Sequence, residues 1–370
     1  MSAFDGVPLK VHYACKALNN LEILRFIRHL GAGLDAVSVE EVKLGLRVGF
    51  RPADICFTPN SVHLSEMEEA AHKGVKINID NLEMLELFAQ RFPDKPVCIR
   101  LNPHIMAGGN SNISVGHIDS KFGISIHQLP HILRLVKTWG INVEGLHMHT
   151  GSDILDEEVF IAAAEILLNA AMSFQDLKYI DFGSGFKVPY KEGDLETNIE
   201  KLGSLISKRM QVFYKEYGRE LDVIFEPGKF LVSESGVLLA RVNTVKVTPS
   251  TLFAGVDTGF NHLLRPMFYG SYHHIENLSN PNGDPRVYNI VGYLCETDTF
   301  AVNRRISEVR VGDILCFYNA GAYCSTMASN YNSRLRPAEV MLHEGKDYLI
   351  RRRERFEDLV RLQKTTGLFE

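Results

Sequence analysis

The feature that most constrains the fold is an alternation of short apolar segments with helix-length amphipathic segments over the first two-thirds of the chain. Eight strand candidates lie at residues 9–13, 33–37, 54–57, 76–79, 96–101, 143–147, 178–182 and 221–226. Predicted helices separate them, at residues 21–30, 39–48, 64–73, 82–91, 129–137, 158–172 and 199–217. Such alternation predicts a parallel sheet, and eight units are the number that closes a barrel. We therefore predict an α/β protein whose first domain, residues 1–235, is a (β/α)8 TIM barrel.

The pattern changes beyond about Ser235, where β-rich segments with Gly and Pro between them replace the alternation. These segments lie at residues 237–247, 251–256, 286–291, 313–317 and 338–342, and one amphipathic helix is expected at residues 353–362. Short strands in succession are typical of a sandwich or barrel. We therefore predict a C-terminal antiparallel β domain, residues 236–370, that is a β-sandwich or a small β-barrel.

Composition and charge narrow the class of partner. The formal net charge of -5 argues against nucleic acid and against an anionic membrane surface. No apolar run approaches the roughly 18 residues of a membrane-spanning helix, and the first residues lack the basic and apolar regions of a signal peptide. The six cysteines are scattered, without a CxxC pair or zinc-finger spacing. We expect a cytoplasmic protein that binds neither nucleic acid nor membrane.

Lys16 is the first candidate for chemistry, because it lies just past the end of the first predicted strand. Barrel enzymes place their reactive groups at the carboxyl ends of the strands. A lysine that is desolvated there has a lowered pKa, and its neutral amine can form a Schiff base. An isolated lysine is more often a solvated surface residue, but other polar residues of this chain also lie at strand ends. We therefore predict that Lys16 is catalytic.

Polar and glycine residues lie in, at the end of, or directly after other predicted strands. They are Asp35, Arg100, the pair His147 and His149, the turn 183–185, and Glu226. Because the carboxyl ends of the strands meet at one rim of a barrel, we expect these groups to surround one cavity. Asp35 and Arg100 are therefore candidates for contacts with a cofactor in that cavity.

Two glycine-containing turns, 183–185 and 226–228, follow neighbouring strands. Glycine lets backbone N–H groups converge on an anion, so together the turns suggest a phosphate site, although each alone is compatible with an ordinary loop. Glu226 beside such a site would repel the phosphate unless the carboxylate faces a cation. The protonated pyridine nitrogen of a phosphorylated cofactor would be such a cation.

The alternate histidines His147 and His149 have three interpretations. A His-x-His pair at a strand end can bind zinc, but no Asp, Glu or His cluster in the sequence stands out as the source of a third ligand. An imidazole can also stack on a planar cofactor, or it can simply pack in the core. With a lysine and a glutamate at the same rim, we favour stacking and predict no metal.

The second predicted domain contains three further groups of reactive residues. Cys295 and Glu296 bring a thiol and a carboxylate together, Tyr323 follows a flexible glycine, and Arg265 lies close in sequence to Tyr269. Each group is also compatible with a structural role when it is considered alone.

Six motifs occur in the order found in a known family, at residues 13–20, 147–152, 183–185, 226–228, 295–296 and 321–323. In this respect nearly the whole chain resembles the fold-type III, alanine-racemase-like pyridoxal-phosphate decarboxylases. The segments 265–269 and 327–334 resemble those members that convert meso-2,6-diaminopimelate to L-lysine and CO2. The resemblance implies this decarboxylase activity, in lysine biosynthesis, with pyridoxal 5'-phosphate as the cofactor.

The resemblance also implies roles for individual residues. Lys16 would hold the cofactor covalently, His149 would stack on its ring, and Glu226 would pair with its pyridine nitrogen. Tyr323 would also reach toward the cofactor. The phosphate would be bound by Ser152, Gly183, Gly185 and Gly228.

For the substrate, the resemblance implies that Arg265 and Tyr269 bind a carboxylate, with Tyr323 nearby. Glu296 would contribute to recognition of the remote amine and carboxylate, and Cys295 or Lys16 would protonate the substrate carbon. In this family Cys295 and Glu296 act in the partner subunit's site. We therefore expect a homodimer whose active sites are completed across the interface.

The chain departs from the family pattern at several places. Lys229 stands where the family commonly has arginine, so a single ammonium contact to the substrate would replace a bidentate one. The spacing after Glu296 is shorter than the family's, so Asp298 takes no role from the resemblance. The lead-in to Lys16 is also short, and we expect a barrel shortened at its N-terminus, with an exposed apolar groove.

Two alternatives remain beside decarboxylation of diaminopimelate. One is a pyridoxal-phosphate enzyme with another substrate or reaction, either a decarboxylase of ornithine or lysine or an amino-acid racemase. A racemase needs a second acid or base, which Tyr323 or Tyr269 could supply. The other alternative is a protein that binds the cofactor without catalysis, which the retention of Lys16, Glu226 and Cys295 together argues against.

Overall fold

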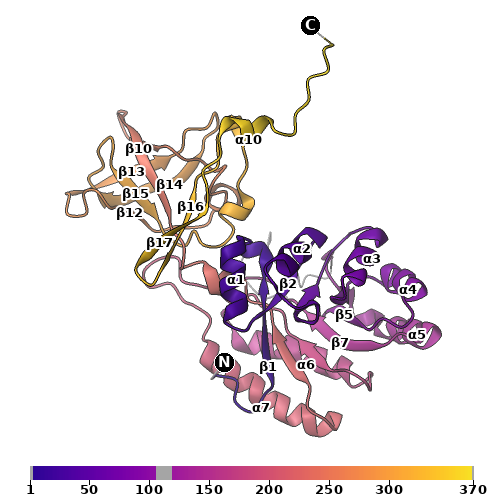
Figure 1. The fold of residues 1–370 in the computed structure, drawn as a ribbon. Helices are drawn as coiled ribbons and strands as arrows, with labels where there is room; N and C mark the ends of the chain where they lie inside the picture. Colours follow the sequence, from indigo (N-terminus) through magenta and orange to yellow (C-terminus); the bar gives the residue numbers. More distant parts are fainter. Residues whose placement is uncertain (1–2, 106–118, 369–370) are drawn as a thin grey trace. The chain divides into compact units, whose positions relative to one another are not determined.

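The computed structural model describes residues 3–105 and 119–368. The chain divides into two compact units. One comprises residues Met1–Pro189 and Gly193–Leu231, and the other comprises Tyr190–Glu192 and Val232–Glu370. The short segment Tyr190–Glu192 thus belongs to the second unit although it lies within the sequence of the first. Figure 1 labels the helices and strands of both units.

Eight parallel strands form a closed ring within the described part of the first unit. They are β1 (Leu9–Ala14), β2 (Gly33–Ala36), β3 (Ile55–Phe57), β4 (Lys76–Ile79), β5 (Val97–Asn102), β7 (Val143–Met148), β8 (Tyr179–Asp181) and β9 (Asp222–Phe225). β1 pairs with both β2 and β9, and β4 pairs with β5, which closes the ring. A two-residue strand, β6 (Ile124–Ser125), pairs with β5 outside the ring. The predicted barrel is confirmed.

Seven helices follow the strands as predicted and lie around them (Figure 1). They are α1 (Leu21–His29), α2 (Val39–Arg47), α3 (Leu64–His72), α4 (Leu82–Arg91), α5 (Leu129–Trp139), α6 (Glu157–Ala171) and α7 (Ile199–Tyr217). Helix α2 is capped at its N-terminus, because the Ser38 side chain accepts from Glu41 N and the Glu41 side chain accepts from Val37 N. A short helix, α8 (Lys229–Val232), follows β9.

The two faces of the barrel strands differ sharply in polarity. One face carries fully buried apolar side chains that pack toward the helices, among them Tyr13, Leu34, Phe57, Ile99, Leu146, Ile180 and Val223. Residues aligned on the other face include Asp35, Cys56, Asn78, Cys98, Arg100, His147 and Asp181. Alternate residues of a strand point to opposite faces, so the second set lies inside the barrel. Barrel interiors are commonly filled by branched apolar residues, so this polar interior marks the functional part of the unit.

The second unit contains one six-stranded sheet in the order β12-β15-β10-β11-β13-β14. Its strands are β10 (Leu238–Val247), β11 (Leu252–Val256), β12 (Ile275–Asn277), β13 (Pro285–Val291), β14 (Thr299–Ser307) and β15 (Ile314–Phe317). The end strands β12 and β14 approach each other, so the sheet curls around an apolar core that includes Val242, Ala254, Ile290 and Phe317. The unit is a curled sheet, without the two stacked sheets of a sandwich.

The predicted antiparallel arrangement of this domain is wrong at one pair, since β11 and β13 are parallel. A separate antiparallel hairpin joins β16 (Glu339–His343) and β17 (Lys346–Arg351). Two short helices complete the unit, α9 (Arg265–Tyr269) and α10 (Phe356–Val360). The helix predicted at residues 353–362 is therefore present but shorter.

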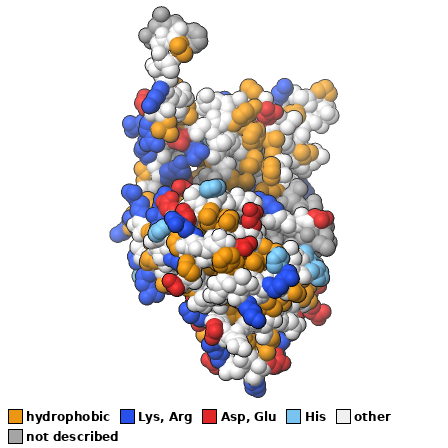
Figure 2. All heavy atoms as spheres, turned by 90° about the vertical axis from the view of Figure 1, so that its right-hand side faces the viewer, with side chains coloured by type: hydrophobic (Ala, Val, Ile, Leu, Met, Phe, Trp, Pro, Cys, Tyr) orange, Lys and Arg blue, Asp and Glu red, His pale blue; other side chains and the backbone are white. Residues whose placement is uncertain are grey.

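No helix in the part of the chain that the structure describes is long and apolar enough to cross a membrane. On the face drawn in Figure 2, acidic and basic side chains are interspersed. This mixed surface agrees with a formal net charge of only -5. The apolar groove expected near the N-terminus stays a prediction, although Phe4 is buried with its ring 5.2 Å from that of Phe225.

Candidate active site

Lys16 lies directly after β1, in a single helical turn formed by Cys15–Ala17. Burial raises the pKa values of Asp35 and Glu41, and the charge of Lys16 partly offsets that rise. The same charge adds to the lowering of the His149 pKa that burial causes. The lysine therefore lies at the carboxyl end of the barrel, as predicted. Its side chain is exposed in the described chain, so the desolvation that would activate it is not provided by the barrel unit itself.

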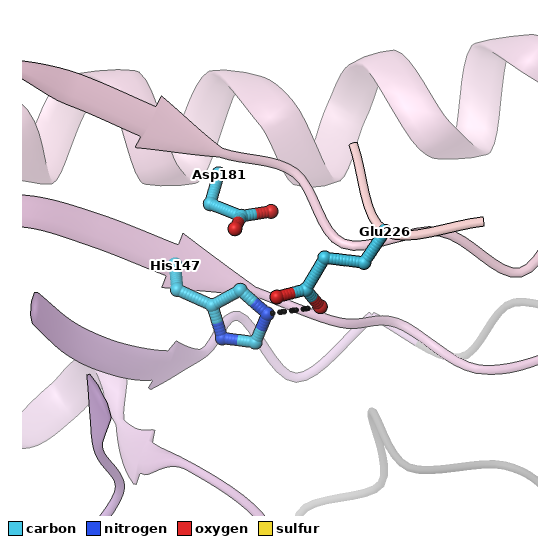
Figure 3. A group of neighbouring side chains, drawn as sticks. All are labelled: His147, Asp181 and Glu226. Carbon is cyan, nitrogen blue, oxygen red and sulfur yellow. Dashed lines mark hydrogen bonds and ion pairs between the residues drawn. The ribbon is translucent and has the colours of Figure 1, made fainter. Parts of the chain in front are cut away.

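Glu226 is the centre of the buried part of the site (Figure 3). Its side chain is 7% exposed, and its Oε2 lies 3.0 Å from Nε2 of His147, which is 1% exposed. Burial would raise the pKa of Glu226, but its interactions with His147 first, and then with His149 and Asp181, together outweigh burial and hold that pKa well below its usual range. Burial lowers the pKa of His147. The neutral imidazole therefore donates Nε2–H to an ionised Glu226.

Asp181, at the end of β8, is the third member of this group (Figure 3). Its Oδ1 accepts a hydrogen bond of 2.8 Å from Gly183 N. One ligand atom from each of His147, Asp181 and Glu226 lies within 4.8 Å of the others, so the three could also hold a metal ion. The sequence showed no source of a third ligand, and the fold brings Asp181 and Glu226 to His147. The absence of a metal stays a prediction. The signal for Asp181 was its place at a strand end, two residues before Gly183.

His149 has a different environment from His147. It is half-buried, and its Nδ1 accepts from Ser184 N at 3.3 Å. Burial first, and the charge of Lys16 second, lower its pKa well below the usual value. The imidazole ring is therefore neutral, and the hydrogen bond from Ser184, in the turn that follows β8, sets its orientation. This is compatible with the stacking role that the resemblance implies.

The glycine turn 183–185 has backbone geometry that excludes larger residues at both glycines. Gly183 and Gly185 have φ of 64° and 124°, a region that favours glycine. A Cβ at Gly183 would lie 2.4 Å from Met148 O, and one at Gly185 would lie 2.1 Å from Gly151 O. The turn thus runs unusually close to the chain that leads to Ser152, which is half-buried.

Lys229 lies beside these turns, directly after Gly228. Its ammonium group forms an ion pair with Asp153, and the Lys229 side chain is 10% exposed. Asp153 follows Ser152 directly and has a φ of 62°. Asp153 was not predicted as a site residue, because it belongs to no recognisable motif. The pairing brings one buried cation and one carboxylate to the expected phosphate site.

Asp35 and Arg100 lie on the interior face of the barrel, 3% and 7% exposed. Burial, reinforced by the charge of Glu226, raises the pKa of Asp35 well above its usual value. The Arg100 guanidinium lies 4.9 Å from the centre of the Phe122 ring. Both predicted positions therefore belong to the same buried polar region as Glu226.

In the second unit, Arg265 is surrounded by three tyrosines. The centres of the Tyr190, Tyr269 and Tyr323 rings lie 5.6, 5.6 and 5.8 Å from its guanidinium carbon. Arg265 Nη2 also donates to Ser271 Oγ at 3.3 Å. The fold thus brings together the predicted residues Arg265, Tyr269 and Tyr323. It also adds Tyr190, from the loop after β8, which was not predicted from the sequence.

Cys295 and Glu296 lie in an exposed loop of the second unit. Cys295 N donates to Asn332 Oδ1 at 3.0 Å, and Tyr331 OH donates to Glu296 Oε1 at 2.7 Å. The buried Asp298 carboxylate accepts from Phe260 N at 2.7 Å and from Leu294 N at 3.1 Å. Asp298 therefore organises the loop that presents the thiol.

The barrel site fits a phosphorylated pyridine. Glu226 Oε1 is buried and has no hydrogen-bond partner among the described residues, which leaves an anionic acceptor for a protonated ring nitrogen. The glycine turns allow close approach of the backbone to an anion, and Lys229 brings a cation to the same place. Glu226 and the phosphate turn would therefore contact opposite ends of one cofactor.

Comparison with known proteins gives the same result. The family model for the pyridoxal binding domain of pyridoxal-dependent decarboxylases matches residues 1–233. The diaminopimelate decarboxylase of Methanothermobacter thermautotrophicus is 39% identical over 98% of this chain and 87% of its own length. That of Escherichia coli K12 is 34% identical over 95% and 88%.

Among solved structures, the diaminopimelate decarboxylase of Helicobacter pylori complexed with L-lysine is 33% identical, with a TM-score of 0.89. The match covers 98% of this chain and 91% of that one. Family model, sequence relatives and solved structure thus agree over most of the chain. The chain therefore belongs to the pyridoxal-dependent decarboxylase family, in the branch formed by the diaminopimelate decarboxylases.

Proposed function

We propose that this chain decarboxylates meso-2,6-diaminopimelate to L-lysine and CO2 with pyridoxal 5'-phosphate as its cofactor. The observation that carries the proposal is the buried, ionised Glu226, held by His147 at 3.0 Å and lying next to a turn that only glycine can form. A buried anion without a fixed cationic partner is costly, and a pyridinium ring would supply that partner. The extent of similarity to the diaminopimelate decarboxylases supports the choice of substrate.

The residues that would hold the cofactor follow from this proposal. Lys16 would bind it covalently, His149 would stack on its ring, and Glu226 would accept a hydrogen bond from its ring nitrogen. The remaining contacts would come from Asp35, Arg100, Ser152, Gly183, Gly185, Gly228 and Tyr323. The place of Lys229 beside the glycine turns favours the phosphate over the substrate as its anionic ligand.

When bound, pyridoxal phosphate supplies an electron sink for the pair released as CO2 leaves. The protein's own contribution is to hold charges and protons in place. Ionised Glu226 keeps a proton on the ring nitrogen, and neutral His147 keeps Glu226 ionised by donating Nε2–H. Cys295 or Lys16 then delivers a proton to the substrate carbon that lost its carboxylate.

Recognition of the remote end of the substrate would fall to Arg265. Its guanidinium is flanked by Tyr269 and Tyr323, which shield it from water and so strengthen its attraction for a carboxylate. Glu296 would bind the remote ammonium group. L-lysine keeps this remote carboxylate and amine, so the product should bind at the same place.

A homodimer in the cytoplasm completes the proposal. Cys295 and Glu296 lie in an exposed loop, where they can act in the site of a partner subunit. All six cysteines lie in the described part of the chain and none is in a disulfide, which is the state expected in a reducing compartment.

The deciding experiment measures CO2 and L-lysine formed from meso-diaminopimelate by purified protein with added pyridoxal phosphate. We expect the two products in equal amounts, and none from Lys16→Ala. Release of CO2 from ornithine or lysine instead would move the assignment to another decarboxylase. Loss of optical purity without CO2 would indicate a racemase. Activity of Lys16→Ala equal to that of the parent would overturn the cofactor chemistry.

A further inference from the structure

We propose that Asp181 is protonated at neutral pH and that its O–H donates a hydrogen bond to the ionised Glu226. Asp181 is thereby the positioning residue that orients the Glu226 carboxylate toward the cofactor's ring nitrogen. This inference deepens the proposed function and rests on it for the identity of the cofactor. The protonation of Asp181 itself is a property of the protein alone and can be tested without cofactor or substrate.

Strand β8 lies between β7 and β9 in the barrel, so Asp181 lies beside both other members of the group. In the barrel register His147 is aligned with Asp181, and Asp181 is aligned with Ile224, two residues before Glu226. Figure 3 shows the three side chains converging from β7, β8 and the end of β9. Asp181 is 1% exposed, so the interaction takes place out of contact with water.

Two unpartnered buried oxygens favour one proton between the two carboxyl groups. Gly183 N donates to Asp181 Oδ1, and His147 Nε2 donates to Glu226 Oε2. If both carboxyl groups were ionised, Asp181 Oδ2 and Glu226 Oε1 would be buried without a donor among the described residues. The ligand atoms of the two carboxyl groups lie within 4.8 Å of each other. Two buried negative charges this close repel each other strongly, so one of the two carboxyl groups stays protonated.

Unequal partners decide which residue keeps the proton. Glu226 accepts from an imidazole N–H, whereas Asp181 accepts from one backbone amide. Other titratable or charged groups that interact electrostatically with one or both members of the pair are His12, Asp35, Cys56, Cys98, Arg100 and His149. Burial and the charge of Glu226 raise the pKa of Asp181 well above its usual value, while the pKa of Glu226 is lowered. Both directions agree with a protonated Asp181 and an ionised Glu226.

This arrangement leaves Glu226 able to do two things at once. An ionised carboxylate has about four lone-pair sites, so Glu226 can accept from His147 and from Asp181 and still accept from a ring N–H. The two donors hold the carboxylate in one orientation before the cofactor arrives. Asp181 thereby contributes orientation without adding a negative charge to the site.

A bound divalent cation is the rival explanation. A cation held by His147, Asp181 and Glu226 would neutralise the same charges, and it would leave Asp181 ionised. The experiment must therefore distinguish a proton from a metal ion.

The first test uses the full-length protein freed of cofactor. Infrared difference spectra between wild type and Asp181→Asn should show the carbonyl stretch of a protonated carboxylic acid at neutral pH, lost in the variant. Absence of that band from the wild type would overturn the proposal. So would a band that appears only after a chelator removes a bound divalent ion, as measured by elemental analysis. Neither result depends on which substrate the enzyme uses.

The second test measures pyridoxal-phosphate affinity and the pH dependence of the bound cofactor's absorbance. Asp181→Asn keeps a neutral donor, so its dissociation constant should stay within about threefold of wild type. Asp181→Ala removes the donor to a charged group and should weaken binding about tenfold or more. This loss should disappear in the Glu226→Gln background, because the effect acts through Glu226. An Asn variant as weak as the Ala variant, or a loss unchanged in Glu226→Gln, would contradict the role.

Discussion

At the residue scale, two side chains show how the site pairs a buried charge. Lys229 and Asp153 form an ion pair in which the lysine side chain is only 10% exposed. A buried ammonium group needs an anionic partner, and Asp153 provides one beside the expected phosphate turn. The cofactor phosphate would compete with this carboxylate for the same cation.

This competition gives a prediction with opposite signs for the two residues. Lys229→Met should weaken pyridoxal-phosphate binding about tenfold or more, because the phosphate loses a charged hydrogen-bond donor. Asp153→Asn should tighten binding severalfold, because the competing carboxylate is gone. Equilibrium binding to cofactor-free protein measures both, and Lys229→Arg, which keeps the charge, is the control. Weaker binding by Asp153→Asn would argue against the competition.

Backbone conformation gives a second prediction at this scale, with a matched control in the chain. Gly185 and Gly193 both have positive φ, 124° and 73°. A Cβ at Gly185 would meet Gly151 O at 2.1 Å, whereas nothing lies within 4 Å of one at Gly193. Gly193→Ala should cost about 1 kcal/mol of stability, and Gly185→Ala should also weaken cofactor binding by about tenfold or more. Thermal unfolding measures the stability of each variant, and titration measures its affinity for the cofactor. If Gly185→Ala and Gly193→Ala bound the cofactor equally well, the close approach at Gly185 would not matter for binding.

At the scale of elements, strands with mainly apolar residues could be predicted from the sequence, and strands interrupted by charged residues could not. The barrel strands and their helices were predicted to within a few residues, because the strands carry apolar side chains toward the helices. β14 was missed because charged Arg304 and Arg305 interrupt its apolar residues. The parallel pairing of β11 with β13 was also missed, since strand direction depends on how the chain crosses the sheet.

The curled sheet of the second unit contains a buried histidine that makes its stability depend on pH. Burial lowers the pKa of His273 from 6.5 to about 4, and its Nδ1 lies 2.8 Å from Tyr318 O. Because the unfolded chain binds the proton more tightly, the stabilisation is complete above pH 6.5 and is lost as the pH falls toward about 4. At 1.36 kcal/mol per pKa unit the full loss is roughly 3 kcal/mol.

His273→Asn should remove this part of the pH dependence, since an amide can still donate to Tyr318 O but does not titrate in this range. Amide hydrogen exchange in β15, measured between neutral and mildly acidic pH, reports the local stability. The exposed neighbour His274 is the control, and His274→Asn should leave the slope unchanged. An unchanged slope in His273→Asn would show that another group titrates.

At the scale of the whole molecule, the proposed homodimer predicts that two inactive variants can restore activity when their subunits are mixed. If Cys295 serves the partner's site, Lys16→Ala and Cys295→Ala each impair both sites of their own homodimers. Random mixing of the two variants would restore one intact site in each hybrid dimer, giving about a quarter of wild-type activity. Activity of the mixture equal to the average of the separate variants would show that Lys16 and Cys295 act in the same subunit.

The sequence by itself determined the barrel, the rim and most of the residues on it. Two periodicities, 2 for strands and 3.6 for helices, specify the elements, and eight parallel strands have one common rim for Lys16, His149 and Glu226. Tertiary structure alone decided which groups touch. The register of β7, β8 and β9 sets His147 and Asp181 against Glu226, and a loop from the barrel sequence brings Tyr190 to Arg265. Pairings of this kind depend on side-chain direction and on distances across the fold, which no local pattern encodes.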